Sequence, residues 1–417
     1  MKSIVVVFCC LCLATSGFAQ EAGLTPVEEL NQRTQTVEDA LRVLQKLKVS
    51  GYIQAQYQWG EKNASLKVGN GNANPDESFN RVGIRRGRIK FTYEEGIASG
   101  VFQLDITEKG VGIKDAYLGV KDPWVGTSSL KAGVFDRPFG NEISYSSSRR
   151  ESPERSTVFQ TLFPEERDLG AALTLQASKT SPWNILKLEA GLFAGNGIKQ
   201  ETDNRRDFIG HLSATKNIGS DAKWGVGVSY YNGGVFQGNE KVYTMDGNAF
   251  VLREHADNVG EFAKREYLGF DGQFSVMSGA GLSQVRAEYL SGTQPGSKSN
   301  SKSPNASAPV ITDTYIREFC GGYVIFVQDL GRSPLSVVLK YDWYDPNTKV
   351  AGDEVGLSGT GSADLDQNTL GLGMLWRVSN NIRLQAYYEI NKEEKTQNVA
   401  TSNLKNDVFT LRLQYKF

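Results

Sequence analysis

The sequence predicts an all-β protein, a transmembrane antiparallel β-barrel of about sixteen strands preceded by a short coiled-coil-like helix. Three observations lead to this fold class. Apolar and polar residues alternate in short stretches from residue 49 to the end, long and short connections alternate between them, and the tryptophans lie at their ends. After the first twenty residues, no apolar run approaches the roughly 18 residues that a transmembrane helix needs.

The chain opens with the pattern of a secretory signal peptide. One lysine precedes an apolar run over residues 4–14, and the small residues Gly17 and Ala19 follow it. The run is too short to span a bilayer as an anchor. We therefore expect residues 1–19 to be removed on export. Cys320 would then be the single cysteine, which excludes a disulfide framework.

Residues 25–48 have the period of a helix, and we assign residues 20–48 as a periplasmic helix and linker ahead of a barrel domain, 49–417. About three heptads are too short to be stable alone, so we expect the helix to pair with copies of itself. A helix lying on its own domain, or a frayed tether, is the alternative. The positions spaced by alternating steps of three and four, as in a coiled-coil seam, are Val27, Leu30, Thr34, Val37, Leu41 and Leu44.

From Val49 onward the period changes to two. Ile53 and Ala55 alternate with Gln54 and Gln56, as expected for a strand with one apolar and one polar face. The same alternation recurs down to the last residue. The expected strands cover residues 53–59, 89–93, 102–106, 114–120, 130–134, 169–177, 186–192, 208–214, 224–230, 267–275, 285–289, 315–327, 335–343, 370–376, 382–390 and 409–417.

The connections between these strands alternate in length. Outer-membrane barrels have short periplasmic turns and longer outer loops, and they close because an unpaired strand edge in hydrocarbon is costly. We therefore expect the apolar faces to point to lipid, the polar faces to a lumen, and the last strand to pair with the first. The connections in the long positions are, in order, 60–83, 108–111, 139–167, 196–207, 232–261, 291–314 and 345–367; the second of them is tight and the fourth is of modest length. The connections in the short positions are 94–97, 179–183, 277–281, 329–333 and 379–381.

A barrel of this size encloses a water-filled channel, so the expected function is the passage of solutes. If Ile89 faces lipid, Arg86, Arg88 and Lys90 form a lumen column with a spacing of about 6–7 Å. Lys131 and Arg137 extend this basic wall, along which an anion could pass between weak sites. The lining is mixed, because the lumen set also contains the acids Asp105, Glu288, Asp342 and Glu389.

The third long connection, residues 139–167, is the candidate constriction. Its apolar residues Phe159, Leu162 and Phe163 could anchor it inside the barrel, where its charges would set the aperture. An ordinary external loop with solvated charges is the alternative. The expected constriction residues are Arg149, Arg150, Glu154, Arg155 and Arg167.

Specific segments resemble the phosphate-selective porin O and P family. These are LKAGVFDRPFGNEISYSSSRRESPERS followed by FPEERDLG, the early basic strand RRGRIKFTYEE, and the C-terminal strand. The resemblance implies a sixteen-stranded barrel, usually trimeric, with an arginine-lined passage for phosphate or polyphosphate. Arg86 and Arg88 match the basic strand, and Glu154 with Arg155 match the pair in the third loop. The family's lysine-rich external loop is not evident in residues 232–265, which leaves phosphate specificity open.

The expected partners follow from this reading. They are small anionic or neutral solutes, outer-membrane lipid, two further copies in a homotrimer, and the outer-membrane assembly machinery of a Gram-negative bacterium. Phe417 resembles the terminal aromatic by which such barrels are recognised for insertion. A net charge of −1 and only 2 histidines favour neither nucleic acid nor a metal site, and we expect no cofactor and no catalytic residue. A diffusion porin without anion preference is one alternative, and a barrel hydrolase using His211 and Ser213 is the other.

Overall fold

The computed structural model of the protein describes residues 25–74, 76–304, 312–402 and 404–417. The signal peptide expected at residues 1–19 lies outside them. The chain divides into two compact units between Lys46 and Leu47, and each is described by itself. Within the described ranges, no helix is long and apolar enough to cross a membrane.

The first unit contains one helix, α1 (Pro26–Lys46), as the heptad pattern predicts. Its N-terminus has a reciprocal cap, because Thr25 N donates to the Glu28 carboxylate at 2.8 Å and Glu28 N donates to Thr25 Oγ1 at 3.3 Å. The apolar seam is open to solvent: Val27, Leu30, Val37 and Leu41 are 50–67% exposed.

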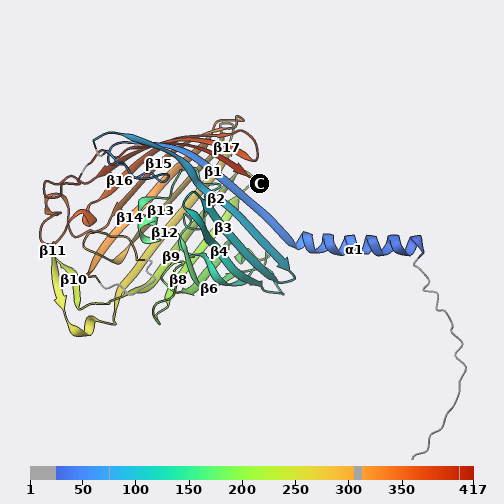
Figure 1. Ribbon diagram of the computed structural model, residues 1–417, viewed down its shortest axis with the longest axis horizontal. Coiled ribbons are helices and arrows are strands. Elements are labelled where there is room, and N and C mark those ends of the chain that lie inside the picture. Colours follow the sequence, from blue (N-terminus) through green and yellow to red (C-terminus); the bar gives the residue numbers. More distant parts are fainter. Residues whose placement is uncertain (1–24, 75, 305–311, 403) are drawn as a thin grey trace, which may run out of the picture. The chain divides into compact units, whose positions relative to one another are not determined.

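The second unit is a closed antiparallel barrel of sixteen strands, and each predicted stretch overlaps one of them (Figure 1). Barrel neighbours are also neighbours along the chain, and β1 pairs with both β2 and β18. The barrel strands are β1 (Leu47–Gly60), β2 (Phe79–Glu95), β3 (Ala98–Thr107), β4 (Gly110–Lys121), β5 (Ser129–Asp136), β6 (Arg167–Gln176), β7 (Leu186–Phe193), β8 (Asp207–Ile218), β9 (Ala222–Phe236), β12 (Phe262–Ser278), β13 (Gly281–Gly296), β14 (Thr314–Asp329), β15 (Leu335–Asp345), β16 (Gln367–Arg377), β17 (Ile382–Glu393) and β18 (Val408–Lys416).

The barrel is apolar outside and polar inside. On β1, Ile53 is 46% exposed whereas its neighbour Gln54 is 0% exposed. On β18, Arg412 is buried between the exposed residues Leu411 and Leu413. A continuous exposed apolar face is stable only against lipid, so the barrel spans a membrane and its polar faces line a lumen.

The closing seam extends to the last residue. β1 and β18 pair from Tyr52 with Lys416 to Gly60 with Val408. Beyond them, Gly51 N donates to Phe417 O at 2.9 Å and Phe417 N donates to Gly51 O at 3.0 Å. A Cβ at Gly51 would overlap the carbonyl oxygen of Arg88 and would lie 2.5 Å from Phe417 Cζ, so the neighbouring strand and the terminal ring together require a glycine there.

The connection over residues 232–261 contains a hairpin, although the sequence analysis predicts a loop there. Strands β10 (Lys241–Asp246) and β11 (Ala249–Glu254) form it, and β10 pairs in parallel with the first residues of β14. Tyr243 stacks on Tyr315 with ring centroids 4.4 Å apart. The hairpin thus covers the edge of β14 where β14 extends beyond its pairing with β15. The remaining short elements are α2 (Thr157–Leu162) and the 3₁₀ helices η1 (Pro182–Ile185), η2 (Ala256–Asn258), η3 (Gly352–Glu354) and η4 (Ser362–Asp364).

Candidate functional site

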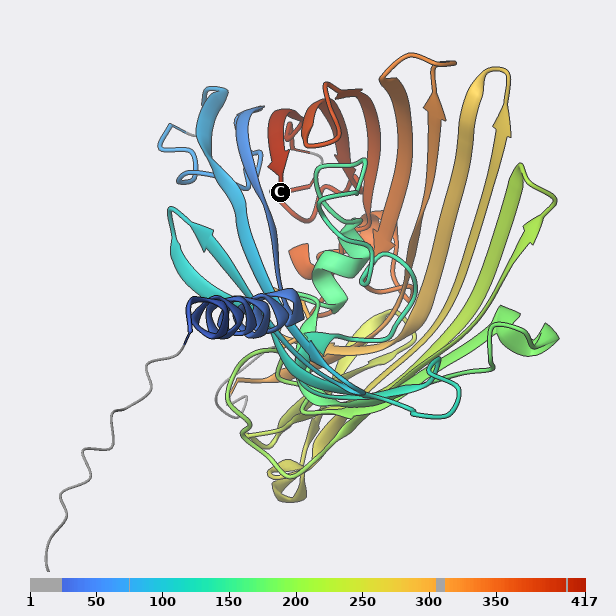
Figure 2. The ribbon, with the colours of Figure 1, turned by 90° about the vertical axis from the view of Figure 1, so that its right-hand side faces the viewer.

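The connection between β5 and β6, residues 137–166, folds into the barrel and is called the third loop below. Looking along the barrel, Figure 2 shows α2 and its flanking chain (green) inside the ring of strands. Phe159 and Phe163 are buried, and their rings pack against Tyr323 and Tyr267, which point inward from the wall. The loop therefore attaches to one side of the lumen through an apolar core.

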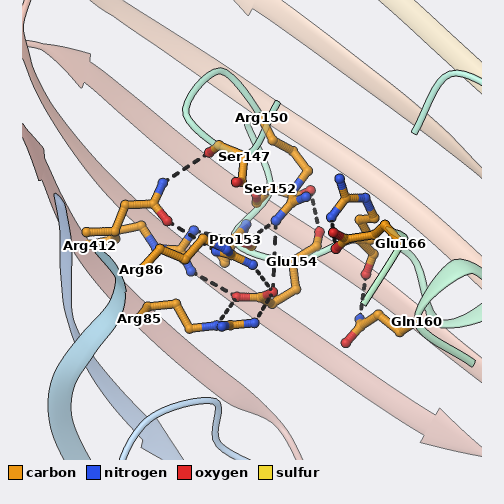
Figure 3. Close-up of polar contacts among 12 residues, drawn as sticks. Arg85, Arg86, Ser147, Arg150, Ser152, Pro153, Glu154, Gln160, Glu166 and Arg412 are labelled. Atoms are coloured by element: carbon orange, nitrogen blue, oxygen red, sulfur yellow. Dashed lines mark hydrogen bonds and ion pairs between the residues drawn. The ribbon is translucent and has the colours of Figure 1, made fainter. Parts of the chain in front are cut away.

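On the opposite side, one carboxylate of the loop, that of Glu154, binds several cations of the wall. Glu154 accepts hydrogen bonds from Arg85 Nε at 2.8 Å, from Arg86 Nη2 at 2.7 Å and from Arg412 Nη2 at 3.1 Å. Figure 3 shows these three wall residues converging on it. Arg150, from the loop itself, lies 3.9 Å away. This buried carboxylate thus joins the loop to β2 and β18, together with hydrogen bonds from Arg88 to Ser147 Oγ and from Gln414 to the carbonyl of Ser148.

Two β-bulges bring extra charges into the lumen. On β1, Gln54 pairs with Arg86 and the next residue pairs with Ile84, so Arg85 has no partner in the ladder. Where β3 pairs with β4, Gln103 pairs with Asp115 and the next residue pairs with Ile113, so Lys114 also has no partner in the ladder. A bulge lets two consecutive side chains point to one face, and here both extra residues contact acids of the third loop.

Glu166 is the second junction between loop and wall. It lies 2.6 Å from Lys114 Nζ and 3.0 Å from Arg167 Nη1, and it also pairs with Arg155. Glu165 and Glu166 both have φ of 64°, a left-handed conformation that non-glycine residues adopt at some cost. The return of the loop to β6 is therefore strained where its charges concentrate.

Both junction carboxylates stay ionised. Burial would raise the pKa of Glu154, but Arg85, Arg86 and Arg412 hold it well below its usual range. Burial would also raise the pKa of Glu166, and its cationic neighbours, Arg155 first, lower it well below the usual range. The loop is therefore attached by charge-assisted hydrogen bonds at neutral pH.

The column expected on β2 does lie along the inner wall. Arg86 binds Glu154, and Arg88 lies 3.3 Å from Asp105 while donating to Ser147 Oγ. Lys90 pairs across the sheet with the inward residue Gln103. Lys131 lies on the lumen face of β5, with its Nζ 5.6 Å from the ring of Tyr117.

Other expected site residues hold the loop together through hydrogen bonds within it. Arg137 is 0% exposed and donates to the carbonyl of Pro164, so it does not line the channel as expected. Arg155 donates to the carbonyls of Glu142 and Ile143. Arg150 is buried and donates to carbonyls within the loop, whereas Arg149 is exposed. Sequence spacing could not separate these roles, because they depend on how the loop folds.

Two cavities flank the loop and differ in charge. The first, of about 400 Å³, is lined by Arg85, Arg86, Arg88, Asp105, Lys114, Glu154, Arg155, Glu165, Glu166, Arg167 and Lys302, together with uncharged residues. The second, of about 420 Å³, has the acids Glu154, Asp342, Glu389 and Glu393 against Lys67, Arg155 and Lys302. One side of the loop is thus basic and the other acidic.

The residues of the hydrolase alternative do not form a nucleophile and base. His211 Nε2 lies 2.8 Å from Asp271 Oδ2, and Ser213 Oγ donates to the carbonyl of Lys187 at 3.5 Å. In the part of the chain that the structure describes, Ser213 and His211 share no hydrogen bond. The arrangement lacks the contact that nucleophilic catalysis needs.

A lipid-facing barrel narrowed by an internal charged loop defines a transmembrane barrel of the outer-membrane type. Among solved structures, the chain is similar to OmpF of Salmonella typhi in a complex with daunomycin (13% identity, TM-score 0.54), covering 89% of this chain and 97% of that one. The outer membrane channel DcaP of Acinetobacter baumannii has 12% identity, TM-score 0.53 and the same coverages. OprB of Pseudomonas putida has 10% identity and TM-score 0.51 over 92% and 97%. At these identities, the likeness concerns the fold. No family model and no curated protein matches the chain.

Proposed function

We propose that the protein is an outer-membrane porin for passive diffusion of small hydrophilic solutes, with a preference for anions such as phosphate or polyphosphate. The observation that supports this most is the cavity beside the third loop, where seven cationic side chains face four acidic ones. Guanidinium groups bind phosphate and carboxylate oxygens in a bidentate geometry. Several such groups in series attract an anion without holding it at any one position.

The acidic cavity favours a second reading, a diffusion porin without anion preference. Asp342, Glu389 and Glu393 gather on the side of the loop away from the basic wall. A field directed across the lumen would let anions pass on one side and cations on the other. The two readings differ in the sign and size of the reversal potential.

The proposal includes location and assembly. A removable signal at residues 1–19 would carry the chain to the outer membrane, where the apolar exterior meets lipid. The names of the similar proteins agree with this: DcaP is described as an outer membrane channel, and one OmpT of Vibrio cholerae (TM-score 0.51) as a trimer form. We propose a homotrimer here as well.

The primary test is single-channel recording in planar bilayers. We expect stable conductance steps and, in a gradient of KCl, a reversal potential that indicates anion preference. Added phosphate should reduce the chloride current, because both anions use the same cations. Absence of channels would refute the porin proposal, whereas cation preference with no effect of phosphate would refute its anion clause.

Replacing Arg86 and Arg88 with Ala should lower the anion-to-cation permeability ratio, roughly fivefold for charges a few ångströms from the path. The barrel should still fold, since Arg85 and Arg412 continue to bind Glu154. The control is Arg81→Ala on the same strand, because Arg81 donates to loop carbonyls and does not line the basic cavity. If the double variant at Arg86 and Arg88 has the same anion-to-cation permeability ratio as Arg81→Ala, the basic wall does not determine selectivity.

Assembly can be tested on α1, whose exposed seam we propose to pair with two copies of itself. Leu30→Asp should reduce the trimer fraction in mild detergent, measured by light scattering after size-exclusion chromatography. Gln32→Asp adds the same charge off the seam and is the control. Unchanged trimers in Leu30→Asp would indicate that the barrels alone hold the assembly, or that α1 is a tether.

A further inference from the structure

A second segment of the chain lies inside the lumen. It is residues 296–304, here called the strap, in the connection between β13 and β14. Ser303 is 2% exposed, and its N–H donates to the carbonyl of Thr161 in α2 at 2.9 Å. Because α2 belongs to the third loop, the strap reaches the constriction itself.

Buried arginines of the barrel wall fix the strap at both ends. Arg265 donates to Ser303 Oγ at 3.1 Å and is itself paired with Asp207. Arg317 donates to the carbonyl of Ser297 at 2.9 Å and lies 2.8 Å from Asp364. These anchors are charge-assisted and buried, so the strap has a defined position in the lumen.

The strap is closed by a tight turn. Ser297 N donates to the carbonyl of Asn300 at 2.9 Å, and a Cβ at Gly296 would lie 2.5 Å from that same carbonyl oxygen. Just after the turn, Lys302 N donates to Asn300 Oδ1 at 2.8 Å. The backbone on both sides of Lys302 is therefore held.

Lys302 lies where the open spaces of the lumen meet. It lines the basic cavity of about 400 Å³, the acidic cavity of about 420 Å³, and a third cavity of about 420 Å³ between the strap and the return of the third loop. Among the described residues, it is the one that borders all three.

We propose that the strap is a second constriction element and that Lys302 sets charge selectivity together with the basic wall. This inference rests on the proposed channel function and deepens it. A cation shared by all three cavities acts on ions whichever side of the third loop they take. It would offset the acidic side and shift the whole lumen towards anions.

The test compares Lys302→Glu with Lys298→Glu in planar bilayers at about 0.1 M salt, where charges act over roughly 10 Å. Lys298 lies on the same strap, is exposed, and lines none of the three cavities. We expect Lys302→Glu to lower the anion-to-cation permeability ratio roughly fivefold and Lys298→Glu to leave it unchanged. Lys302→Gln should give an intermediate ratio.

The outcomes distinguish failure of the channel proposal from failure of the role given to Lys302. If the wild-type protein forms no channel, the porin proposal fails before Lys302 is considered. If it conducts and both glutamate variants have the wild-type ratio, the role of Lys302 is overturned while the channel stands. Equal shifts in the two variants would mean that general surface charge, and not the position in the strap, determines selectivity. Heat-modifiable migration on gels, measured for each variant, confirms that its barrel is folded.

Discussion

Glu154→Gln should loosen the third loop where it meets β2 and β18 and produce larger, unsteady single-channel currents. The amide preserves the shape of the side chain but removes the one carboxylate bound by Arg85, Arg86 and Arg412. Three guanidinium groups, of which Arg86 and Arg412 are buried, would then repel each other without compensation, and removing one partner of a buried ion pair typically costs about 3–5 kcal/mol. Planar-bilayer recordings should therefore show a higher mean conductance, frequent transitions between levels and a stronger anion preference.

Glu240→Gln is the control, because Glu240 is exposed, lies in another connection and lines none of the three cavities. It should conduct as the wild type does. Quiet wild-type channels from Glu154→Gln would mean that the apolar anchors around Phe159 hold the loop without help from this carboxylate.

The pH dependence of the wild type has a defined sign. The pKa of Glu154 is lowered on folding, so its stabilising effect is complete above the pKa of an unfolded glutamate, about 4.3. It is lost as the pH falls through the lower folded pKa. Wild-type channels should thus remain steady from pH 8 to 5 and resemble Glu154→Gln only under strongly acid conditions.

Deleting Phe417 should reduce the amount of inserted barrel by about an order of magnitude, through the loss of two hydrogen bonds to Gly51 and of the packed ring. Barrels that do insert should conduct normally, because Phe417 is 47% exposed and lines none of the three cavities. Heat-modifiable migration of outer-membrane fractions measures the folded amount, and bilayer recording measures conductance.

Tyr415→Ala removes a neighbouring outward-facing aromatic and serves as the control. It should insert well, since its backbone pairing with Ile53 stays in place. Phe417→Ala separates the two contributions, because it retains the pairing with Gly51 and loses the ring. Normal insertion after deletion of Phe417 would exclude its role in assembly.

The fold could be predicted from sequence because a strand between lipid and water has one apolar and one polar face. Ile53 beside Gln54, and Leu411 beside Arg412, already show which face is which. The β10–β11 hairpin also had a local signal, the Gly247-Asn248 pair between two alternating stretches, with Gly247 at φ of 61°.

The site was predicted less completely. The period of two predicts that Arg86 and Arg88 face the lumen, but it does not predict this for Arg85 and Lys114. Their inward direction results from bulges, which arise from the register between neighbouring strands and leave no pattern in one strand alone. Likewise, no spacing distinguishes Arg137, which is buried behind the loop, from a lining residue.

The sequence by itself determined the number of strands, the face of each that meets lipid, and the closure of β1 against β18, because these depend on periodicity and on the cost of an open edge in a membrane. Only the tertiary structure decided which charges meet inside. The contacts of Glu154 with Arg412, and of Ser303 with Thr161, join residues far apart in the chain. Such contacts depend on how two connections fold into the lumen, which the alternation along each strand does not specify.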